Sequence, residues 1–376
     1  MKVDGTESSV ILDCGTGSVK AGFAGDKAPT TLFTSVVGHP KYTVAMVDAG
    51  HKESYVGWEA QSKRGVLDLR YPVKRGIVQN WEDMERVWHH TFHVALRVNP
   101  EERGLMLTEP PLTPRANSEK TAEIMFETFS CPALHLAAQS ELALYSSGRV
   151  SGVVIDSGEG VTHVTSVYQG YYLPQSVVKV ETAGEDVTRY LEVLLNRAGC
   201  TEFTTSAERE IVRDIKERMA FTAVDPQTAI SDRRLEKTYT LPDGQTVSVA
   251  AERFQCSEVM FNPGLLGQHE SPGIHVATYH SLINCDIDTR SELYRNIFLV
   301  GGNTKLSSMD LRLRKELKYL LPSGVRIGVT APPERKYSVW IGGSILASLI
   351  TFGTKIWIPK LEYEEYGPSI VHRLKR

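Results

Sequence analysis

The chain has no long apolar run, no closely paired cysteines and no block of like charges. No stretch reaches the ~18 continuous apolar residues of a membrane helix, so no membrane insertion is expected. A net charge of −3 without runs of one sign does not indicate nucleic-acid binding. The cysteines are scattered and odd in number, at Cys14, Cys131, Cys200, Cys256 and Cys285. This pattern favours reduced thiols in the cytosol or nucleus over a disulfide framework or a zinc site.

Length and composition indicate a globular protein of more than one domain. The polar start, residues 1–9, predicts no secretory signal. An apolar content of 41% is that of a soluble protein with a large core, and 376 residues predict two or three domains.

The most informative stretch is VILDCGTGSVK, residues 10–20, in which an apolar run leads into D-x-G-x-G and then returns. It predicts a β-hairpin with a glycine turn. Glycines let backbone N–H groups approach an anion closely. Asp13 could hold a hydrated cation, and Lys20 returns a positive charge towards the turn. Alone, such a hairpin is also compatible with a turn that binds nothing.

The same pattern recurs at residues 153–163, VVIDSGEGVTH. Its aspartate, Asp156, lies 143 residues after Asp13 (156 − 13). A repeat at this spacing predicts two lobes, each giving one hairpin to a shared cleft that clamps a phosphate chain. Two hairpins that share the acidic residue and both glycines favour ligand binding over a plain turn.

Two helices carry clear start signals. Asn80 is a predicted N-cap, and Thr205 with Glu208 forms a predicted capping box. The first helix carries His89 and His93 at i, i+4, a spacing that could ligate a metal. No acidic third ligand is evident, so a structural helix is favoured.

Strands and helices alternate along the chain, which predicts an α/β fold with ligand turns at strand ends. A third glycine turn, GGNT at 301–304, follows a predicted strand, and residues 137–145 are expected to form a helix. The hairpins alone do not distinguish sugar kinases, Hsp70-type ATPases and actins.

Longer stretches resemble the actin family over almost the whole chain. They are AGFAGD (21–26), YVGWEAQSKRG (55–65), WHHTF (88–92), IMFETF (124–129), DSGEGVTH (156–163), AEREIVRDIKER (207–218), APPERKYSVWIGGSILASL (331–349) and GPSIVHR (367–373). The resemblance implies an actin-like two-lobe ATPase fold of the Hsp70/sugar-kinase superfamily, with a nucleotide cleft between the lobes. The small lobe would be 1–146 plus 337–376, with 35–71 as its inserted outer subdomain. The large lobe would be 147–336, with about 183–272 inserted.

The resemblance also implies a site for ATP or ADP with Mg²⁺ or Ca²⁺. The cofactor-binding residues would be Asp13, Gly15, Thr16, Gly17, Lys20, Asp156, Gly158, Glu159, Gly160, Val161, Arg213, Lys216, Glu217, Gly301, Gly302 and Lys336. Asp13 and Asp156 would hold the metal through water, and Gln139 and His163 would act on the attacking water. The chemistry agrees, because a metal-bound polyphosphate needs carboxylates, backbone N–H donors and a lysine.

The chain departs from the usual actin pattern near this site. Most actins have Asn where this chain has Cys14, and Asp where it has the longer Glu159. Other replacements are Lys305-Leu306 for a Met-Tyr pair near the adenine, Glu185 for an arginine, and Arg75 for an often-methylated histidine. The chain ends in RLKR, without the usual Lys-Cys-Phe, and its start lacks the dense acidic cluster used for myosin. These changes affect hydrolysis, subunit contacts and myosin binding more than the fold.

The resemblance implies a cytoplasmic, cytoskeletal protein that forms or joins filaments and hydrolyses ATP slowly on assembly. The alternative is a structural subunit of a fixed complex that binds nucleotide without bulk filaments. Expected partners are the chain itself, conventional actin, and actin-binding proteins at the cleft between subdomains. A sugar kinase would need a substrate aspartate and leaves the actin-like stretches unexplained. A protease nucleophile at Ser157 is disfavoured within a glycine turn.

Surface segments bear on assembly. The expected longitudinal contacts are Asp286, Asp288, Arg290, Tyr168, Gly170 and Tyr171, with Val44, Met46 and Val47 of the 41–51 loop as apolar anchors. The loop at 261–273 would present Leu265 and Leu266 across strands.

Overall fold

The computed structural model describes residues 8–41, 52–199, 203, 205–230, 235–349 and 356–373. The chain divides into two compact units, one formed by Met1–Val150 with Tyr337–Arg376 and the other by Ser151–Lys336. The boundary at 150/151 lies close to the expected one at 146/147. The outer subdomains expected at 35–71 and 183–272 stay a prediction.

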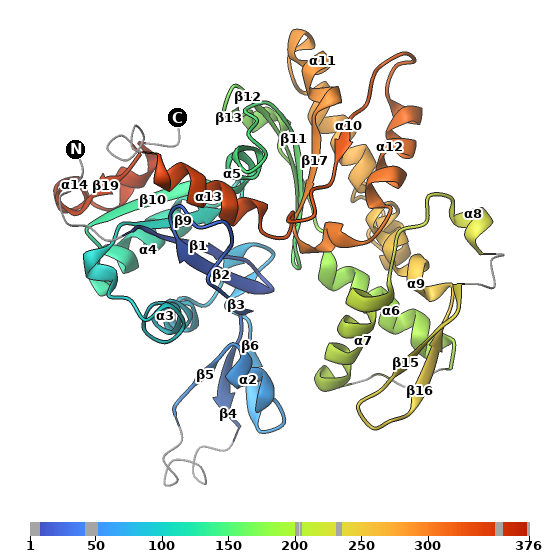
Figure 1. The fold of residues 1–376 in the computed structure, drawn as a ribbon, viewed down its shortest axis with the longest axis horizontal. Helices are drawn as coiled ribbons and strands as arrows, with labels where there is room; N and C mark the ends of the chain where they lie inside the picture. Colours follow the sequence, from blue (N-terminus) through green and yellow to red (C-terminus); the bar gives the residue numbers. More distant parts are fainter. Residues whose placement is uncertain are drawn as a thin grey trace. The chain divides into compact units, whose positions relative to one another are not determined.

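The main sheet of the first unit has the strand order β19-β10-β9-β1-β2-β3 (Figure 1). Its strands are β1 (Val10–Cys14), β2 (Ser18–Phe23), β3 (Thr31–Thr34), β9 (Leu105–Glu109), β10 (Ala133–Ala138) and β19 (Ile358–Pro359). β1, β9 and β10 run parallel, and β1 forms the predicted hairpin with β2, in which Asp13 lies opposite Lys20. Part of the helix expected at 137–145 is wrong, because residues 137 and 138 end β10 and α5 covers only Gln139–Tyr145.

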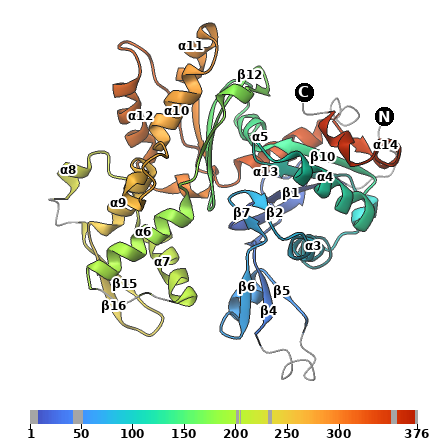
Figure 2. The same ribbon diagram turned by 180° about the vertical axis from the view of Figure 1, so that it is seen from behind.

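Alternate residues of β1 point to opposite sides of the sheet, and the apolar residues on both sides are buried. Helices therefore cover both faces of this sheet. Val10 and Leu12 pack in the same core as Trp88, on α3 (Trp81–His89), which continues as the π-helix η2 (His90–Leu96). On the other side, Trp340 of α13 (Ser338–Ser348) donates its Nε1–H to the Ile11 carbonyl at 3.1 Å. Figures 1 and 2 both show α3 and α13 on opposite sides of β1. As predicted, Asn80 caps α3.

Smaller elements complete the first unit. They are β4 (Val37–Pro40), β5 (Tyr55–Val56), α2 (Trp58–Ser62), β6 (Leu67–Arg70), β7 (Val73–Lys74), β8 (Ile77–Val78), η3 (Pro100–Glu102), α4 (Arg115–Glu123), η4 (Ile124–Thr128), α14 (Lys360–Tyr366) and η10 (Pro368–His372). β5, β4 and β6 form a separate sheet with its own small core, and β7 with β8 forms a hairpin. The loop expected at 41–51 lies outside the described residues apart from Lys41.

The second unit is built on a sheet of order β13-β12-β11-β17-β18, with β14 also paired to β12. The strands are β11 (Gly152–Ser157), β12 (Thr162–Tyr168), β13 (Tyr171–Tyr172), β14 (Val178–Val180), β17 (Ile297–Val300) and β18 (Val329–Thr330). β11 and β12 form the second predicted hairpin, in which Asp156 lies opposite His163. β11 runs parallel to β17, so both hairpins continue into a parallel sheet.

Helices and one further hairpin complete the second unit, and most of them contribute residues to one core. They are η5 (Pro174–Ser176), α6 (Gly184–Arg197), α7 (Ser206–Met219), α8 (Pro226–Ala229), β15 (Lys237–Thr240), β16 (Thr246–Val249), α9 (Glu252–Gln255), η7 (Cys256–Met260), η8 (Pro263–Leu266), α10 (Ile274–Ile283), α11 (Ile287–Arg295), η9 (Gly302–Lys305) and α12 (Met309–Leu320). The predicted capping box opens α7, because Thr205 accepts from the Glu208 N–H and Glu208 accepts from the Thr205 N–H. Across the described ranges, no helix is long and apolar enough to span a membrane.

Candidate functional site

Two turns are expected from the sequence to share a ligand, and each turn is called a half-site for that reason. The first half-site is the β1–β2 turn with Asp13 and Lys20. The turn is closed by a hydrogen bond from the Gly15 N–H to the Ser18 carbonyl, 3.0 Å long. Asp13 is 4% exposed, and its Oδ2 lies 2.5 Å from the Lys20 ammonium nitrogen. Thr108, near the end of β9, donates to the other carboxylate oxygen at 2.8 Å. Lys20 therefore balances the charge of the buried carboxylate, and the hydrogen bond from Thr108 fixes its orientation.

Gln139 joins the same cluster from a different strand. It follows β10 as the first residue of α5, and its Nε2 lies 3.5 Å from Asp13 Oδ1 and 3.3 Å from Thr108 Oγ1. The structure thus brings together Asp13, Lys20 and Gln139 and adds Thr108, which the sequence reasoning missed. The available signal was its position at the end of an apolar strand that could neighbour β1, where parallel sheets place ligand-binding residues.

The second half-site is the β11–β12 turn with the start of α6. The Gly158 N–H donates to the Val161 carbonyl at 3.2 Å, which repeats the closure of the first turn. The Gly184 N–H donates to the Gly158 carbonyl at 3.0 Å, and the Glu185 N–H to the Glu159 carbonyl at 2.8 Å. A Cβ on Gly184 would lie 2.8 Å from the Glu159 carboxylate, so this glycine allows the helix to start against the turn.

Cations from α7 face Glu159. Lys216 is 6% exposed, donates to the Gly184 carbonyl at 2.8 Å and places its ammonium nitrogen 3.8 Å from the Glu159 carboxylate. Arg213 pairs with Glu217 at 3.1 Å. Burial opposes the charge on Arg213, but Glu159 and other nearby carboxylates outweigh it and raise the pKa of the guanidinium. The structure therefore groups Glu159, Arg213, Lys216 and Glu217.

The third glycine turn packs directly against Asp156. Gly301 has φ 89°, and a Cβ there would lie 2.3 Å from the Ser157 carbonyl oxygen and 2.7 Å from Asp156 Oδ1, so only glycine fits. Gly302 follows in η9, where a Cβ would lie 4.0 Å from Cγ of Lys336. Lys305 and Leu306, the two replacements expected near the adenine, follow this turn, and Leu306 is buried in the core of the second unit. Gly301, Gly302, Asp156 and Lys336 therefore belong to one neighbourhood.

His163 is a buried, neutral histidine. It lies across the hairpin from Asp156, is 6% exposed, and its pKa is lowered by burial and by Lys179 to about 4. At pH 7 its imidazole is uncharged, so it can donate or accept a hydrogen bond without gaining a proton.

Ser157 is committed to structure. Its Oγ lies 2.7 Å from Thr162 Oγ1 and accepts a hydrogen bond from the Asn303 amide at 2.9 Å. The side chain is 1% exposed. These contacts agree with the expectation that Ser157 is no protease nucleophile.

The two turns have room for a phosphate at their glycines. Neither Gly15 nor Gly158 has a positive φ, and a Cβ would meet only the Ser18 carbonyl oxygen at 3.4 Å or the Val161 carbonyl oxygen at 3.9 Å. The fold itself therefore does not require glycine at either position, whereas close backbone approach by an anion does. Each turn by itself also has a carboxylate and a lysine beside it, Asp13 with Lys20 at the first and Glu159 with Lys216 at the second, and this combination fits a metal-bound phosphate.

A divalent cation also fits, provided water and phosphate complete its shell. No group of three or more His, Cys, Asp or Glu in the described part of the chain is placed to hold a metal by itself. Mg²⁺ commonly keeps several waters and binds one or two carboxylates with substrate phosphates. The rings of His89 and His93 lie 4.4 Å apart at their centres, and among the residues that the structure describes no Cys, Asp, Glu or further His joins them as a third metal ligand.

A sequence model of one protein family, described as Actin, matches residues 5–375. The match covers nearly the whole chain and includes both hairpins, the third glycine turn and α7. Mixed α/β sheets in each unit agree with it, so the predicted fold class, the actin-like two-lobe ATPase fold, is confirmed. The chain belongs to the actin family.

Proposed function

We propose that this chain is an ATP-binding cytoskeletal protein that forms or joins filaments and hydrolyses ATP slowly as it assembles. The repeated hairpin carries this proposal. Both copies place an aspartate opposite the residue seven positions later and close the turn with the same hydrogen bond. Both keep a glycine that the protein's own packing does not demand. A turn that served folding alone would not need this combination.

The proposed roles follow from the chemistry of each side chain. Asp13 and Asp156 would hold the divalent cation through water, and Lys20 would pair with phosphate. Arg213, Lys216, Glu217, Gly301, Gly302 and Lys336 form the nucleoside end. Bound Mg²⁺ would supply charge neutralisation of the phosphate oxygens.

Gln139 and His163 are proposed to orient the attacking water. Gln139 offers an amide held against Asp13 and Thr108. His163 offers an uncharged imidazole at neutral pH, since its pKa is about 4. Neither group needs to change its protonation state to hold water, which suits slow hydrolysis.

Binding is tested by thermal unfolding with and without MgATP. Asp13→Asn should abolish the ATP-dependent rise in Tm, because a ligand stabilises only the state that binds it. The control is Asp243→Asn, an exposed aspartate in the turn between β15 and β16. Absence of any ATP-dependent rise in the wild-type protein would contradict the proposal.

Hydrolysis is tested with Gln139→Ala. Phosphate release should slow while ATP affinity is largely retained. Equal losses of rate and affinity would instead show that Gln139 only supports Asp13 and Thr108, which it contacts directly.

Assembly is tested by sedimentation with ATP, Mg²⁺ and salt. Tyr171 is 66% exposed and Asp286 and Asp288 are exposed, as a contact surface requires, whereas Arg290 already donates to the carbonyls of Cys285 and Ile283. Leu265 is 43% exposed, but Leu266 packs on the core. We expect this chain to enter filaments with weaker affinity than conventional actin. By analogy with lost interface anchors, the cost should be ~1–3 kcal/mol per subunit contact, which would raise the critical concentration roughly 5- to 150-fold.

Met46→Asp should abolish pelleting, although Met46 lies outside the described residues. A wild-type protein that binds ATP but neither pellets nor co-pellets with conventional actin would favour the structural-subunit alternative.

A further inference from the structure

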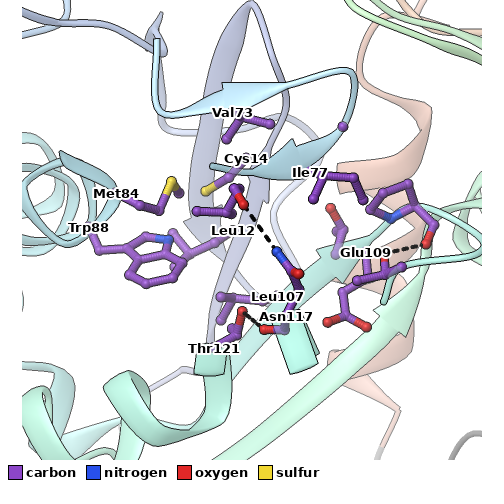
Figure 3. Close-up of a pocket in the computed structure, with 15 residues that line it drawn as sticks. Leu12, Cys14, Val73, Ile77, Met84, Trp88, Leu107, Glu109, Asn117 and Thr121 are labelled. Atoms are coloured by element: carbon purple, nitrogen blue, oxygen red, sulfur yellow. Dashed lines mark hydrogen bonds between the residues drawn. The ribbon is translucent and has the colours of Figure 1, made fainter. Parts of the chain in front are cut away.

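The first unit contains a pocket of about 50 Å³ beneath the β1–β2 turn. Figure 3 shows the side chains that line it, from the end of β1, the β7–β8 hairpin, α3, the end of β9 and α4. Most of its wall is apolar, with Leu12, Met84 and Leu107 among the lining residues. The pocket lies on the α3 side of the sheet, and no residue proposed to bind nucleotide lines it.

A buried donor without a good acceptor belongs to this pocket. Trp88 is 2% exposed, and its indole Nε1–H makes no hydrogen bond of normal geometry. Burial and Asp13 raise the pKa of the neighbouring Cys14 thiol to about 12, although the indole and Lys20 act in the opposite sense. The indole is thus near the thiol without a hydrogen bond of normal geometry. A thiol sulfur is a weak acceptor, so this N–H lacks a good one.

Other polar groups of the pocket are already occupied as donors. The Asn117 amide donates to the Val78 carbonyl at 3.1 Å, and Thr121 donates to the Asn117 carbonyl at 2.9 Å. Thr113 donates to the Pro110 carbonyl at 2.7 Å. None of these hydrogen bonds involves the indole, so an incoming molecule would have to supply its acceptor. Glu109 also lines the pocket, which disfavours an anion.

We propose that this pocket binds a small, neutral molecule whose oxygen accepts a hydrogen bond from the Trp88 indole and whose methyl groups pack on the apolar wall. The volume limits its size. An apolar cavity of ~150 Å³ holds benzene, so about 50 Å³ admits only a solute smaller than benzene. Amides, ketones and sulfoxides of that size are the ligand class.

The pocket shares residues with the supports of the first half-site. Thr108 lines it and donates to Asp13, and Gly76 lines it and donates its N–H to Thr16 Oγ1 at 3.1 Å. An occupant should therefore alter ATP affinity through these two contacts. This consequence rests on the proposed function, whereas binding in the pocket does not.

The probe is dimethyl sulfoxide, titrated into purified protein whose methionine methyl groups carry ¹³C. The chain has eight methionines, and the Met84 signal is assigned with Met84→Leu. We expect a saturable Met84 shift with a dissociation constant on the order of 1–10 mM, as for a very small ligand. Trp88→Phe keeps the ring but removes the donor and should weaken binding about tenfold.

Trp81→Phe is the matched control, because Trp81 neighbours Trp88 at 6.5 Å between ring centres but does not line the pocket. It should leave the Met84 shift unchanged. Cys14→Asn adds an amide carbonyl for the indole and should abolish saturable binding. A wild-type protein without a saturable shift holds only water there, which overturns the proposal. Equal affinity in wild type and Trp88→Phe also overturns it.

The second arm measures ATP affinity with and without 100 mM dimethyl sulfoxide. This concentration is about tenfold the upper expected dissociation constant. An altered affinity that Cys14→Asn abolishes supports the coupling to the half-site, and an unaltered one overturns that coupling. If ATP fails to bind at all while the Met84 shift persists, the proposed function fails and the pocket stands.

Discussion

In the β1–β2 hairpin Asp13 faces Lys20, whereas in the β11–β12 hairpin Asp156 faces His163. The two pairs occupy the same register, and each aspartate is the next-to-last residue of a strand that runs parallel to a neighbouring strand. The first pair forms an ion pair with 2.5 Å between charged atoms. The second contains an uncharged imidazole, because burial lowers the pKa of His163 to about 4.

The second turn obtains its cation from elsewhere in the chain. Lys216 reaches it from α7, 3.8 Å from Glu159, and is fixed by the Gly184 carbonyl at the start of α6. The first turn therefore carries its own positive charge, whereas the second depends on two helices that follow it in sequence. Repeated backbone geometry does not imply repeated electrostatics.

The largest effect should come from removing the cation of the first hairpin. Lys20→Met leaves the Asp13 carboxylate, which is 5% exposed, without its partner, and should cost about 3–5 kcal/mol of unfolding free energy. All five tryptophans, Trp58, Trp81, Trp88, Trp340 and Trp357, belong to the first unit. Tryptophan fluorescence during denaturation without nucleotide therefore reports on the unit that carries the change.

The double variant Asp13→Asn/Lys20→Met is the control, because it removes both charges. It should recover most of the lost stability. If the double variant is as unstable as Lys20→Met, the loss comes from packing of the lysine stem and not from an uncompensated charge.

The second hairpin should instead show a pH effect. His163 is uncharged when folded, with a pKa near 4, and has an ordinary pKa of 6.5 when unfolded. Between these pH values the unfolded state binds more protons than the folded state. The contribution of His163 to the unfolding free energy is therefore complete above pH 6.5 and is lost as pH falls towards 4. The loss between pH 7 and pH 5 should be on the order of 2 kcal/mol.

Far-UV circular dichroism during denaturation at several pH values measures this slope. His163→Gln should flatten it by that amount, even though other histidines also titrate. An unchanged slope in His163→Gln would show that the pKa of His163 is the same in the folded and unfolded states.

Local signals in the sequence predicted the elements that depend on neighbours along the chain. Asn80 caps α3, and the Thr205–Glu208 capping box opens α7, because both signals act within one helical turn. Both glycine hairpins formed for the same reason. Their internal register is set by the turn and the alternation of apolar residues.

Features that depend on distant segments were missed. β10 has the sequence ALHLAA, rich in helix formers, but it lies between β9 and β19, where tertiary pairing overrides propensity. Thr108 reaches Asp13 across 95 residues, and Lys216 reaches Gly184 across 32. No periodicity reports such contacts, because they arise only when strands and helices are placed side by side.

The two turn glycines should prove equally tolerant in folding and equally needed for binding. In Gly15→Ala and Gly158→Ala the new Cβ meets no atom closer than 3.4 Å and no positive φ, so unfolding free energy should change by less than about 1 kcal/mol. ATP affinity, measured by calorimetry, should fall at least about tenfold because the methyl occupies the phosphate's approach.

Gly301→Ala is the contrasting variant, since its Cβ would lie 2.3 Å from a carbonyl oxygen at φ 89°. It should lose stability as well as affinity. If Gly15→Ala and Gly158→Ala bind ATP as well as the wild type, the turns do not contact phosphate.

The smallest effect concerns matching positions in the two hairpins, Cys14 and Ser157. Ser157 is hydrogen-bonded to Thr162 and Asn303, whereas next to Cys14 the buried Trp88 indole has no hydrogen bond of normal geometry. Cys14→Asn supplies an amide oxygen and should raise the unfolding free energy by about 1 kcal/mol in tryptophan-monitored denaturation. Cys14→Ala, which adds no acceptor, should not raise it. Ser157→Ala should lower it by about 1–2 kcal/mol because the Asn303 amide loses its hydroxyl acceptor and keeps only the weak Met260 sulfur. Equal stabilities of Cys14→Asn and Cys14→Ala would show that the indole gains nothing from an acceptor, which would place the difference between the hairpins in their charges alone.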